Sequence, residues 1–351
     1  MNSNQIYDVT IIGGGPAGLY SAFYSGLREM KTKIIEYHTF LGGKVHVYPE
    51  KLIWDIGGVT PITGEQLIEQ MVQQAKTFDP EIVLGEKVTA IEKDDQDLFL
   101  IETASGEQHI SKTVILAVGG GIITPSRLEL EGANRFEVSN LNYTVTSLSK
   151  FHGKTVLISG GGNVAIDWAN ELEPIAKKVY LTYRNEGLKG HEAEVKKLQN
   201  SSVELLLKTS IHKLVADHAH DQINAVELLN KEDASTFNIE VDEVIINHGY
   251  ERDTALLTQS GVDVKVTEEY RVAASPMCET SVPGLFAAGD IVDHEGKFKL
   301  IAGAFQEAGN AVNMAKLYID PDANNRGRVS SHNDLFQEKN RELIKHLYKR
   351  E

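Results

Sequence analysis

A strand-like run that ends in a glycine-rich turn occurs twice in this chain, and this repeat limits the possible folds more than any other feature. Residues 6–12 are mostly β-branched, which is typical of a buried parallel strand, and residues 13–18 follow with the pattern Gly-x-Gly-x-x-Gly. A helical stretch over 17–28 and a strand over 33–36 complete a βαβ unit. The same order returns over 155–183, so the sequence predicts an α/β protein with two Rossmann-like dinucleotide-binding domains.

The first turn has the residues that a bound dinucleotide requires. Gly13 permits the tight bend, Gly15 lets the backbone approach a pyrophosphate, and Gly18 lets the helix pack closely on the strand. The N-terminus of the helix then faces the phosphate charge. Glu36 ends the next strand, where its carboxylate can accept hydrogen bonds from an unphosphorylated ribose. We therefore predict nucleotide binding here; the alternative is a tight strand–helix turn beside a surface glutamate.

The second turn has the same pattern with alanine at its third position, but its ribose end differs. The following strand leads into Arg184 instead of an acid, and an arginine can pair with a 2′-phosphate that an acid would repel. This favours NADP over NAD, although an exposed arginine beside an NAD site stays open as an alternative, because Asn185 offers no second charge. The residues predicted to bind this dinucleotide are Gly160, Gly162, Asn163, Ala165, Arg184 and Lys189.

Two sites of unlike ribose preference suggest an FAD that is held permanently and an NADPH that visits, as hydride transfer from nicotinamide to flavin requires. A strand, a Gly-Asp turn and a helix are expected over 285–320 and are assigned to the first domain, which is then discontinuous in sequence. The polar stretch 320–333 is expected to be a mobile connector. The expected domains are an FAD-binding domain over 1–120 and 281–330, an NADP(H)-binding domain over 121–280, and a tail over 331–351 with a short amphipathic helix.

Composition narrows the function. Cys278 is the single cysteine, so an intrachain disulfide, a CxxC pair and a cysteine-rich metal site are excluded. We expect no bound metal, and we expect a reducing, cytoplasmic location. No run of 18 apolar residues indicates a membrane span, and no signal peptide is visible. The formal net charge of −15 argues against nucleic-acid binding. Residues 326–351 are the exception, with seven basic and four acidic side chains.

Three further segments resemble motifs of the two-dinucleotide-binding flavoprotein reductases. Residues 280–290, Thr-Ser-Val-Pro-Gly-Leu-Phe-Ala-Ala-Gly-Asp, are similar to their second FAD motif, and residues 113–119 and 245–250 are similar to their Ala-Thr-Gly motifs. The order of motifs over 6–320 resembles the short, thioredoxin-reductase-like branch. That branch carries CxxC near residues 141–145, where this chain has no cysteine, so a reduced flavin would have to pass its electrons directly to a docked acceptor.

Residues 42–44 and 48–51, together with the C-terminal extension, make the chain similar to the thioredoxin-reductase-like ferredoxin–NADP⁺ reductases over nearly its full length. The resemblance implies an FAD-dependent oxidoreductase that moves electrons from NADPH to ferredoxin or flavodoxin. Hydride transfer to the flavin would be followed by one-electron steps to the acceptor. The resemblance also implies a homodimer.

The resemblance assigns roles to single residues. In that family one aromatic side chain stacks on the flavin, and the tail of a partner subunit covers the other flavin face. Tyr48 is at the place of the stacking residue, and the alternative is a tyrosine that only packs in the protein. His332 is near the place of the covering residue, and the alternative is an exposed histidine on a mobile tail. Beyond the first turn, the residues assigned to FAD are Glu36, Lys44, Tyr48, Val88, Ile123, Asp290, Ile301 and Ser331, and the candidate catalytic residues are Tyr48 and His332.

Two other functions stay open. A disulfide or thiol reductase could use Cys278, although that cysteine is far in sequence from either CxxC location of the related reductases. A non-catalytic redox sensor could bind both nucleotides and contact a partner protein through its basic tail.

Overall fold

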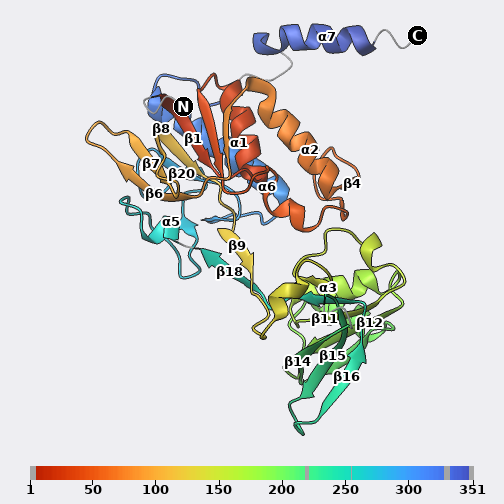
Figure 1. Cartoon of the computed structure of the whole chain (residues 1–351). Helices are drawn as coiled ribbons and strands as arrows, with labels where there is room; N and C mark the ends of the chain where they lie inside the picture. Colours follow the sequence, from red (N-terminus) through yellow and green to blue (C-terminus); the bar gives the residue numbers. More distant parts are fainter. Residues whose placement is uncertain (1–4, 218–220, 254, 328–332, 348–351) are drawn as a thin grey trace. The chain divides into compact units, whose positions relative to one another are not determined.

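The computed structural model describes residues 5–217, 221–253, 255–327 and 333–347, and the chain divides into two compact units (Figure 1). Unit 1 consists of Met1–His46, Lys51–Ile122 and Arg252–Glu351, and unit 2 consists of Val47–Glu50 and Ile123–Glu251. Each unit contains a parallel sheet that begins with one of the two strand–glycine turn–helix repeats, which confirms the α/β class and the two Rossmann-like folds.

Unit 1 is built on a seven-stranded sheet in which β5, β2, β1, β8 and β20 run parallel. β6 and β7 extend it as an antiparallel meander from β8. The strands are β1 (Ile6–Ile12), β2 (Thr32–Glu36), β5 (Glu81–Leu84), β6 (Val88–Lys93), β7 (Phe99–Thr103), β8 (Gln108–Leu116) and β20 (Leu285–Ala287). Two short pairs of this unit are β3 (Leu52–Ile53) with β4 (Ile62–Thr63) and β19 (Val272–Ala273) with β21 (Val292–Asp293). A third pair, β9 (Ile122–Pro125) with β18 (Tyr250–Asp253), lies at the two places where the chain passes from one unit to the other.

Helix α1 packs against both α2 and α6 (Figure 1). The rings of Tyr20 on α1 and Phe305 on α6 lie 5.3 Å apart. α2 begins with a capping box, in which Thr63 and Gln66 exchange side chain to backbone hydrogen bonds. The α-helices of unit 1 are α1 (Pro16–Leu27), α2 (Gly64–Ala75), α5 (Ala255–Thr258), α6 (Ile301–Ile319) and α7 (Gln337–Leu347), and its 3₁₀ turns are η1 (Gly43–Val47), η2 (Lys76–Phe78) and η6 (Asp334–Phe336).

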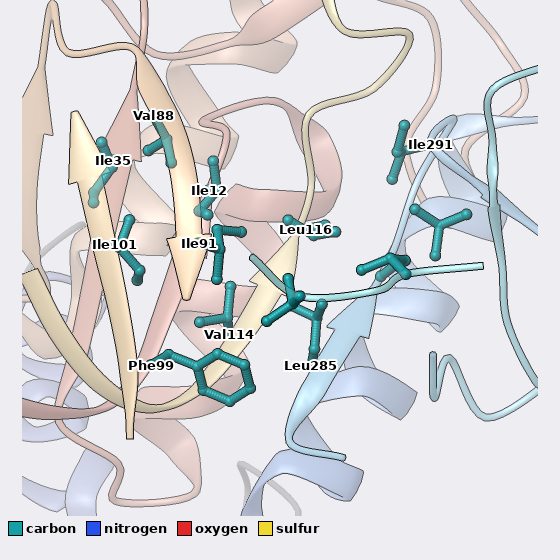
Figure 2. Close-up of a cluster of buried hydrophobic side chains, with 14 of the residues drawn as sticks. Ile12, Ile35, Val88, Ile91, Phe99, Ile101, Val114, Leu116, Leu285 and Ile291 are labelled. Carbon is teal, nitrogen blue, oxygen red and sulfur yellow. The ribbon is translucent and has the colours of Figure 1, made fainter. Parts of the chain in front are cut away.

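The core of unit 1 lies along the sheet, as Figure 2 shows. Each fully buried aliphatic side chain of this kind contributes about 1.5–3 kcal/mol relative to an exposed one. The core therefore fixes the strands whose ends carry the first glycine turn. Its labelled members are Ile12, Ile35, Val88, Ile91, Phe99, Ile101, Val114, Leu116, Leu285 and Ile291.

Residues 252–280 also contribute to this core, and here the structure differs from the expected domain boundary. Val262, Val264 and Val272 are buried in the core of unit 1, and the Ser260 hydroxyl accepts a hydrogen bond from the Ile91 amide at 3.1 Å. The chain therefore returns to unit 1 after Glu251 and not after residue 280. No glycine turn or long strand marks this return in the sequence.

Unit 2 contains a five-stranded parallel sheet in the order β10-β17-β11-β12-β13 and an antiparallel sheet in the order β14-β15-β16. Buried apolar clusters lie against the parallel sheet, one of them formed with α3. The strands are β10 (Leu141–Asn142), β11 (Thr155–Ser159), β12 (Lys178–Tyr183), β13 (Glu204–Leu207), β14 (Thr209–Ala216), β15 (Ile223–Asn230), β16 (Thr236–Glu240) and β17 (Glu243–Ile246). The helices and 3₁₀ turns are α3 (Asn163–Leu172), α4 (Glu192–Gln199), η3 (Ala133–Phe136) and η4 (Ser149–Phe151).

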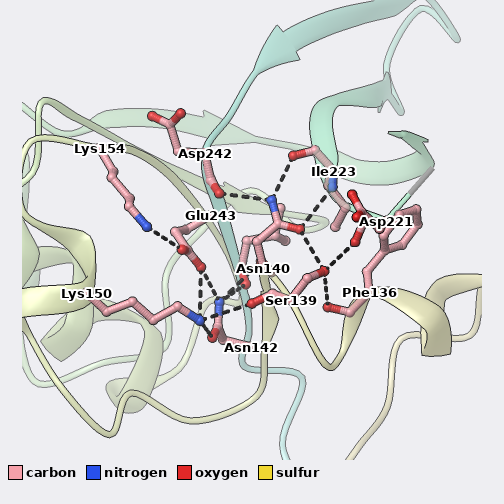
Figure 3. Close-up of polar contacts among 11 residues, drawn as sticks. Phe136, Ser139, Asn140, Asn142, Lys150, Lys154, Asp221, Ile223, Asp242 and Glu243 are labelled. Atoms are coloured by element: carbon pink, nitrogen blue, oxygen red, sulfur yellow. Dashed lines mark hydrogen bonds and ion pairs between the residues drawn. The ribbon is translucent and has the colours of Figure 1, made fainter. Parts of the chain in front are cut away.

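A polar network ties the starts of the parallel strands of unit 2 together (Figure 3). Asn140 donates to the carbonyl of Ile223 at 2.7 Å and accepts from its amide at 2.9 Å. The side chain of Glu243 is 3% exposed and pairs with Lys154 at 2.7 Å and Lys150 at 3.3 Å. Because these buried polar groups are all bonded, the network costs little desolvation and fixes β17 relative to its neighbours.

The C-terminal segment includes the short helix that the sequence predicted, α7. Residues 320–327 of the connector before it, which the structure describes, are attached to α1 rather than free of contacts as a mobile segment would be. Arg28 on α1 donates to the carbonyl of Asn324 at 2.5 Å, and the amide of Gly327 donates to the Tyr24 hydroxyl at 3.1 Å. Polar composition alone did not reveal this attachment, because the connector is held through its backbone groups.

None of the helices in the described part of the chain is long and apolar enough to cross a membrane. Within the same residues, no three His, Cys, Asp or Glu side chains gather as a metal ion would need.

Candidate functional site

The first glycine turn leaves no room for a side chain at two of its three glycines. A Cβ on Gly13, whose φ is +109°, would lie 2.4 Å from the carbonyl oxygen of Ala117. A Cβ on Gly18 would lie 1.9 Å from the carbonyl oxygen of Gly13. Gly15 differs, because the nearest atom to its Cβ would be the Cα of Gly43 at 3.7 Å. Gly13 and Gly18 therefore shape the turn, while the space at Gly15 is open to a ligand.

Four parallel strands end at the edge of the sheet where this turn lies. Ile12 pairs with Ile35 and Leu116, and Leu116 pairs with Ala287. The turns after β1, β2, β8 and β20 therefore converge, at the edge where open α/β sheets bind ligands. α1 begins there with Gly15 as its N-cap, with no side-chain cap and no acid in its first turn. Its free N–H groups and positive end suit an anion.

Glu36 closes the first turn from the end of β2. The residue is 6% exposed; its Oε2 accepts a hydrogen bond from the Gly14 amide at 2.6 Å and its Oε1 accepts one from the His38 amide at 2.8 Å. The carboxylate thus lies at the turn, as the sequence predicted, and each oxygen has a further lone pair for a ribose hydroxyl. The contact with Gly14 was not foreseen.

The segment after β2 folds over the turn and brings Lys44 with it. The Gly42 amide donates to the carbonyl of Gly14 at 2.9 Å, and a Cβ on Gly43 would lie 2.7 Å from the Cα of Gly15. Lys44 follows in η1 with an exposed side chain. Gly43 is therefore required by the close approach of two backbones, and Gly42 by its φ of +127°, at which a Cβ would lie 2.6 Å from the His46 ring.

Asp290 is the second acid at this edge. It is exposed and follows Gly289, which has a φ of +84° and whose Cβ would lie 2.9 Å from the Cβ of Ala17 on α1. The Gly289–Asp290 turn is therefore packed against the first turn of α1. Ile301 is the first residue of α6, which also starts with no side-chain cap and no acid in its first turn.

Val88 and Ile123 were expected to approach the cofactor through their backbone. The Val88 side chain is 6% exposed and belongs to the core, and the Glu86 amide donates to the carbonyl of Glu36 at 3.1 Å. This bond brings the backbone that precedes Val88 to the first turn. Ile123 lies in β9, and its side chain is outside the described part of the structure.

Neither candidate catalytic residue belongs to the described part of unit 1, which carries this group. Tyr48 lies in the short segment Val47–Glu50, which belongs to unit 2, where Glu50 accepts a hydrogen bond from the amide of Leu148 at 2.7 Å. No local pattern indicated this contact, because it joins positions far apart in the chain. Ser331 and His332 lie outside the described residues.

The second glycine turn repeats the geometry of the first. A Cβ on Gly160 would lie 2.5 Å from the carbonyl oxygen of Asn247, whereas a Cβ on Gly162 would meet no atom within 4 Å. Ala165 takes the third position and is 1% exposed. α3 begins after Gly162 with no side-chain cap and no acid in its first turn. This helix start can also receive an anion.

The chain beyond β12 carries the predicted basic residues back to this turn. Arg184 is exposed directly after β12, and the Lys189 amide donates to the carbonyl of Gly161 at 2.6 Å. The side-chain oxygen of Asn163 accepts from the amide of His191 at 2.9 Å. The structure therefore gathers all the residues predicted for the second dinucleotide.

Two residues after β17 complete this turn and were not predicted as site residues. The side-chain oxygen of Asn247 is buried and has no hydrogen-bond partner among the described residues. The Nε2 atom of His248 lies 2.8 Å from the Ser159 hydroxyl. Loss of hydration and then the charge of Arg184 lower the pKa of His248. The signal in the sequence was Asn-His-Gly directly after a buried strand.

The structure does not offer a reactive thiol. Cys278 is fully buried, and burial followed by the negative charge of Glu307 raises the pKa of its thiol to about 12. A thiolate is therefore scarce at neutral pH. Residues 141–145 lie near the CxxC position of the branch that the sequence motifs resemble. In this chain Asn142 donates to Glu243 there at 2.9 Å and is part of the polar network in Figure 3.

Comparisons with known proteins agree with this geometry. Residues 7–315 match the family model described as pyridine nucleotide-disulphide oxidoreductase, so fold and glycine turns together define an oxidoreductase of that class. Among solved structures, the thioredoxin reductase of T. acidophilum matches with a TM-score of 0.72 at 26% identity, over 91% of this chain and 100% of the other. The bacillithiol disulfide reductase Bdr of Bacillus cereus matches with a TM-score of 0.66 at 21% identity, over 89% and 99% of the two chains, which shows the fold alone.

Curated relatives are much more similar. Ferredoxin–NADP reductase 1 of Bacillus mycoides is 63% identical over 349 residues, which cover 99% of this chain and 100% of the relative. Ferredoxin–NADP reductase 1 of Oceanobacillus iheyensis is 61% identical over 340 residues, 97% of each chain. The chain therefore belongs, within the pyridine nucleotide-disulphide oxidoreductase family, to the ferredoxin–NADP reductases with the thioredoxin-reductase fold. The resemblance seen in the sequence motifs is confirmed.

Enzymes of this family use FAD and NADPH, and the residues of this chain fit both. At the first turn, the open space at Gly15 and the uncapped start of α1 suit a pyrophosphate. At the second turn, the space at Gly162 is equally open. The buried side-chain oxygen of Asn247, which has no partner among the described residues, can accept a hydrogen bond there.

Proposed function

We propose that this protein transfers electrons from NADPH to ferredoxin through FAD bound at the first glycine turn. The observation that carries the proposal is a difference between the two sites at the place where the ribose of each dinucleotide would bind. Glu36 would accept hydrogen bonds from a ribose diol and would repel a phosphate, whereas Arg184 would pair with the 2′-phosphate of NADPH. The high identity to ferredoxin–NADP reductases supports the same assignment.

At the first turn, each residue has a separate binding task. The N–H groups at the start of α1 would bind the pyrophosphate, Glu36 the adenosine ribose and Asp290 the ribityl chain. The α6 start at Ile301 would face the pyrimidine end of the flavin. Lys44 and the backbone near Val88 and Ile123 would line the cofactor. When bound, FAD supplies a centre that accepts a hydride from NADPH and gives up its electrons one at a time.

At the second turn, the chain would hold NADPH in a pose suitable for hydride transfer. The start of α3 at Gly160, Gly162, Asn163 and Ala165 would bind the pyrophosphate, and Arg184 with Lys189 would bind the 2′-phosphate. No side-chain acid or base is needed for the hydride itself, so the protein contributes mainly orientation. Each turnover oxidises one NADPH, reduces two ferredoxins and releases one proton to the solvent.

The test is steady-state reduction of ferredoxin with purified protein and NADPH. Turnover at or above about 1 per second, with a yellow protein that contains FAD, is expected of an enzyme. Bound flavin without turnover for any acceptor would instead support a redox sensor. Flavodoxin in place of ferredoxin in the same assay tests the second proposed acceptor.

For the flavin faces we retain the roles implied by the family resemblance. Tyr48 would stack on one face, and Ser331 and His332 from the tail of a second copy would cover the other, which requires a homodimer. Sedimentation measures the oligomeric state.

Removal of the chain from Ser331 onward should change the flavin spectrum and the rate of flavin reduction. A longer removal, from Arg326 onward, takes away seven basic and four acidic side chains and should also flatten the salt dependence of turnover with an acidic ferredoxin. An unchanged spectrum, rate and salt slope would remove His332 from the site.

A thiol reductase is the competing enzyme function, and the burial of Cys278 counts against it. Cys278→Ser should leave NADPH-dependent turnover nearly unchanged. A fall of more than about tenfold without loss of flavin would restore the thiol relay. A cytoplasmic location remains our proposal, and cell fractionation tests it.

A further inference from the structure

Behind the Gly289–Asp290 turn, unit 1 holds a buried ion pair that the glycine motifs do not explain. Lys297 lies just before α6 and Glu307 lies within it, and their side chains are only 6% and 5% exposed. The Nζ atom of Lys297 lies 2.7 Å from each carboxylate oxygen of Glu307. On the other side, Nε2 of His294 lies 3.2 Å from Oε1 of Glu307.

This ion pair binds both polar backbone groups of Gly289. The amide of Gly289 donates to Oε2 of Glu307 at 2.8 Å, and its carbonyl accepts from Nζ of Lys297 at 2.7 Å. All three N–H groups of the Lys297 ammonium are therefore used, two by Glu307 and one by Gly289. Gly289 also lies close to α1, because a Cβ on it would be 2.9 Å from the Cβ of Ala17. The glycine is held from two directions.

Stability alone does not explain such a pair. Two buried charges lose their hydration, and an apolar pair of similar volume is often as stable or more stable. An apolar pair here, however, would leave the buried N–H of Gly289 without its acceptor, which proteins avoid, and would leave its carbonyl with the Val292 amide, at 3.1 Å, as the remaining donor. The opposite charges match the backbone donor and acceptor of one residue in a way that no apolar pair can.

We propose that Lys297 and Glu307 are positioning residues of the cofactor site, which fix the Gly289 backbone and thereby set Asp290 and the start of α6 against the N-terminus of α1. Because Lys297 precedes α6 and Glu307 lies inside it, one ion pair fixes both Asp290 and Ile301. The inference rests on the proposed function, since it assumes that Asp290 contacts FAD.

The experiment measures FAD binding and folding stability separately. Apoprotein is titrated with FAD, and its unfolding in urea is followed without FAD. Lys297→Met should raise the dissociation constant for FAD about tenfold or more, as is usual when the support of a binding group is removed. It should also lower stability, because the buried carboxylate of Glu307 loses its ammonium partner and keeps only His294 and the Gly289 amide.

Lys33→Met is the matched control. Lys33 is also buried, at 7% side-chain exposure, and also pairs with a carboxylate, Glu81, at 3.1 Å in the same unit. Its removal should lower stability but leave the dissociation constant for FAD within about twofold of the unsubstituted protein. Equal weakening of FAD binding by Lys33→Met and Lys297→Met would overturn the proposal, because it would show a general effect of instability.

A double variant, Lys297→Met with Glu307→Met, keeps the test decisive if the single variant does not fold. It removes both charges, so stability should recover toward that of the unsubstituted protein, but FAD binding should stay weak because Gly289 has lost both of its hydrogen bonds to the ion pair. A stable double variant with unchanged FAD affinity and flavin circular dichroism would refute the positioning role. Failure of the unsubstituted apoprotein to bind FAD would refute the proposed function instead.

Discussion

The ammonium of Lys33 donates a hydrogen bond to Nδ1 of His109 across 3.0 Å inside unit 1, where the two residues are 6% and 3% exposed. An ammonium has no acceptor, so Nδ1 can take part only when it carries no proton. Burial, followed by the charge of Lys33, lowers the pKa of His109 accordingly. The imidazole is thus held neutral by its surroundings.

Acid should therefore destabilise the protein through His109. The pKa of this ring is lower in the folded chain than the ordinary value of about 6.5, so the unfolded chain binds more protons as the pH falls through that value. The contribution of the neutral ring to the free energy of unfolding is therefore fully present above the ordinary pKa and is lost as the pH falls below it. His109→Gln should reduce the fall in the free energy of unfolding between about pH 7.5 and about pH 5.5, measured in urea. The exposed His152→Gln is the control, and an equal slope in both variants would contradict the assignment.

Replacement of Glu36 should weaken both the turn and its ligand. Glu36→Ala leaves the amides of Gly14 and His38 without their acceptor, which should cost about 1–3 kcal/mol of apoprotein stability and should weaken FAD binding. Urea unfolding and flavin titration measure the two effects. Glu102→Gln, at an exposed position of β7, should change neither. Full flavin content in Glu36→Ala would argue against a ribose contact.

The glycines of the first turn should fall into two classes. Gly15→Val should give a folded apoprotein without FAD, because a side chain there meets open space that a pyrophosphate would need. Gly18→Ala should fail to fold, because its Cβ would lie 1.9 Å from a backbone oxygen. Far-ultraviolet circular dichroism and flavin absorbance separate the outcomes. Normal flavin content in Gly15→Val would refute the site.

Arg184→Ala should discriminate between the two nicotinamide cofactors. We expect the KM for NADPH to rise by the equivalent of about 1–3 kcal/mol, the usual value of a charged hydrogen bond, with a much smaller change for NADH. Lys231→Ala, an exposed charge elsewhere in unit 2, is the control. Equal changes for both cofactors would show that Arg184 does not read the 2′-phosphate. Removal of Arg184 should also raise the pKa of His248, which nuclear magnetic resonance can follow.

The parts of the site that sequence alone predicted are those with a local pattern. Gly13, Gly18 and Glu36 lie within one strand–turn–helix–strand unit, and Arg184 occupies the matching place in the second, so periodicity and spacing locate them. Asp290 was found through its motif. The roles given to Tyr48 and His332 remain predictions.

What the sequence did not reveal depends on contacts between distant segments. Residues 252–280 carry short apolar stretches that suit either unit, and only the burial of Val262 and Val264 shows which core they complete. Lys297 and Glu307 have the spacing of ordinary surface charges near a helix start. Nothing in their identity shows that both are buried around the backbone of Gly289.

The single, shielded cysteine has a practical consequence. Cys278 is fully buried and its thiol pKa is about 12, so a maleimide should leave the natural chain almost untouched. A cysteine introduced at Val138, which is 94% exposed in unit 2, would then be the one thiol that reacts. A second at Trp54, 69% exposed in unit 1, would allow a pair of dyes without removal of the native cysteine. Energy transfer between those dyes would follow, in solution and during turnover, the distance between the part of the chain that carries the first glycine turn and the part that carries the second.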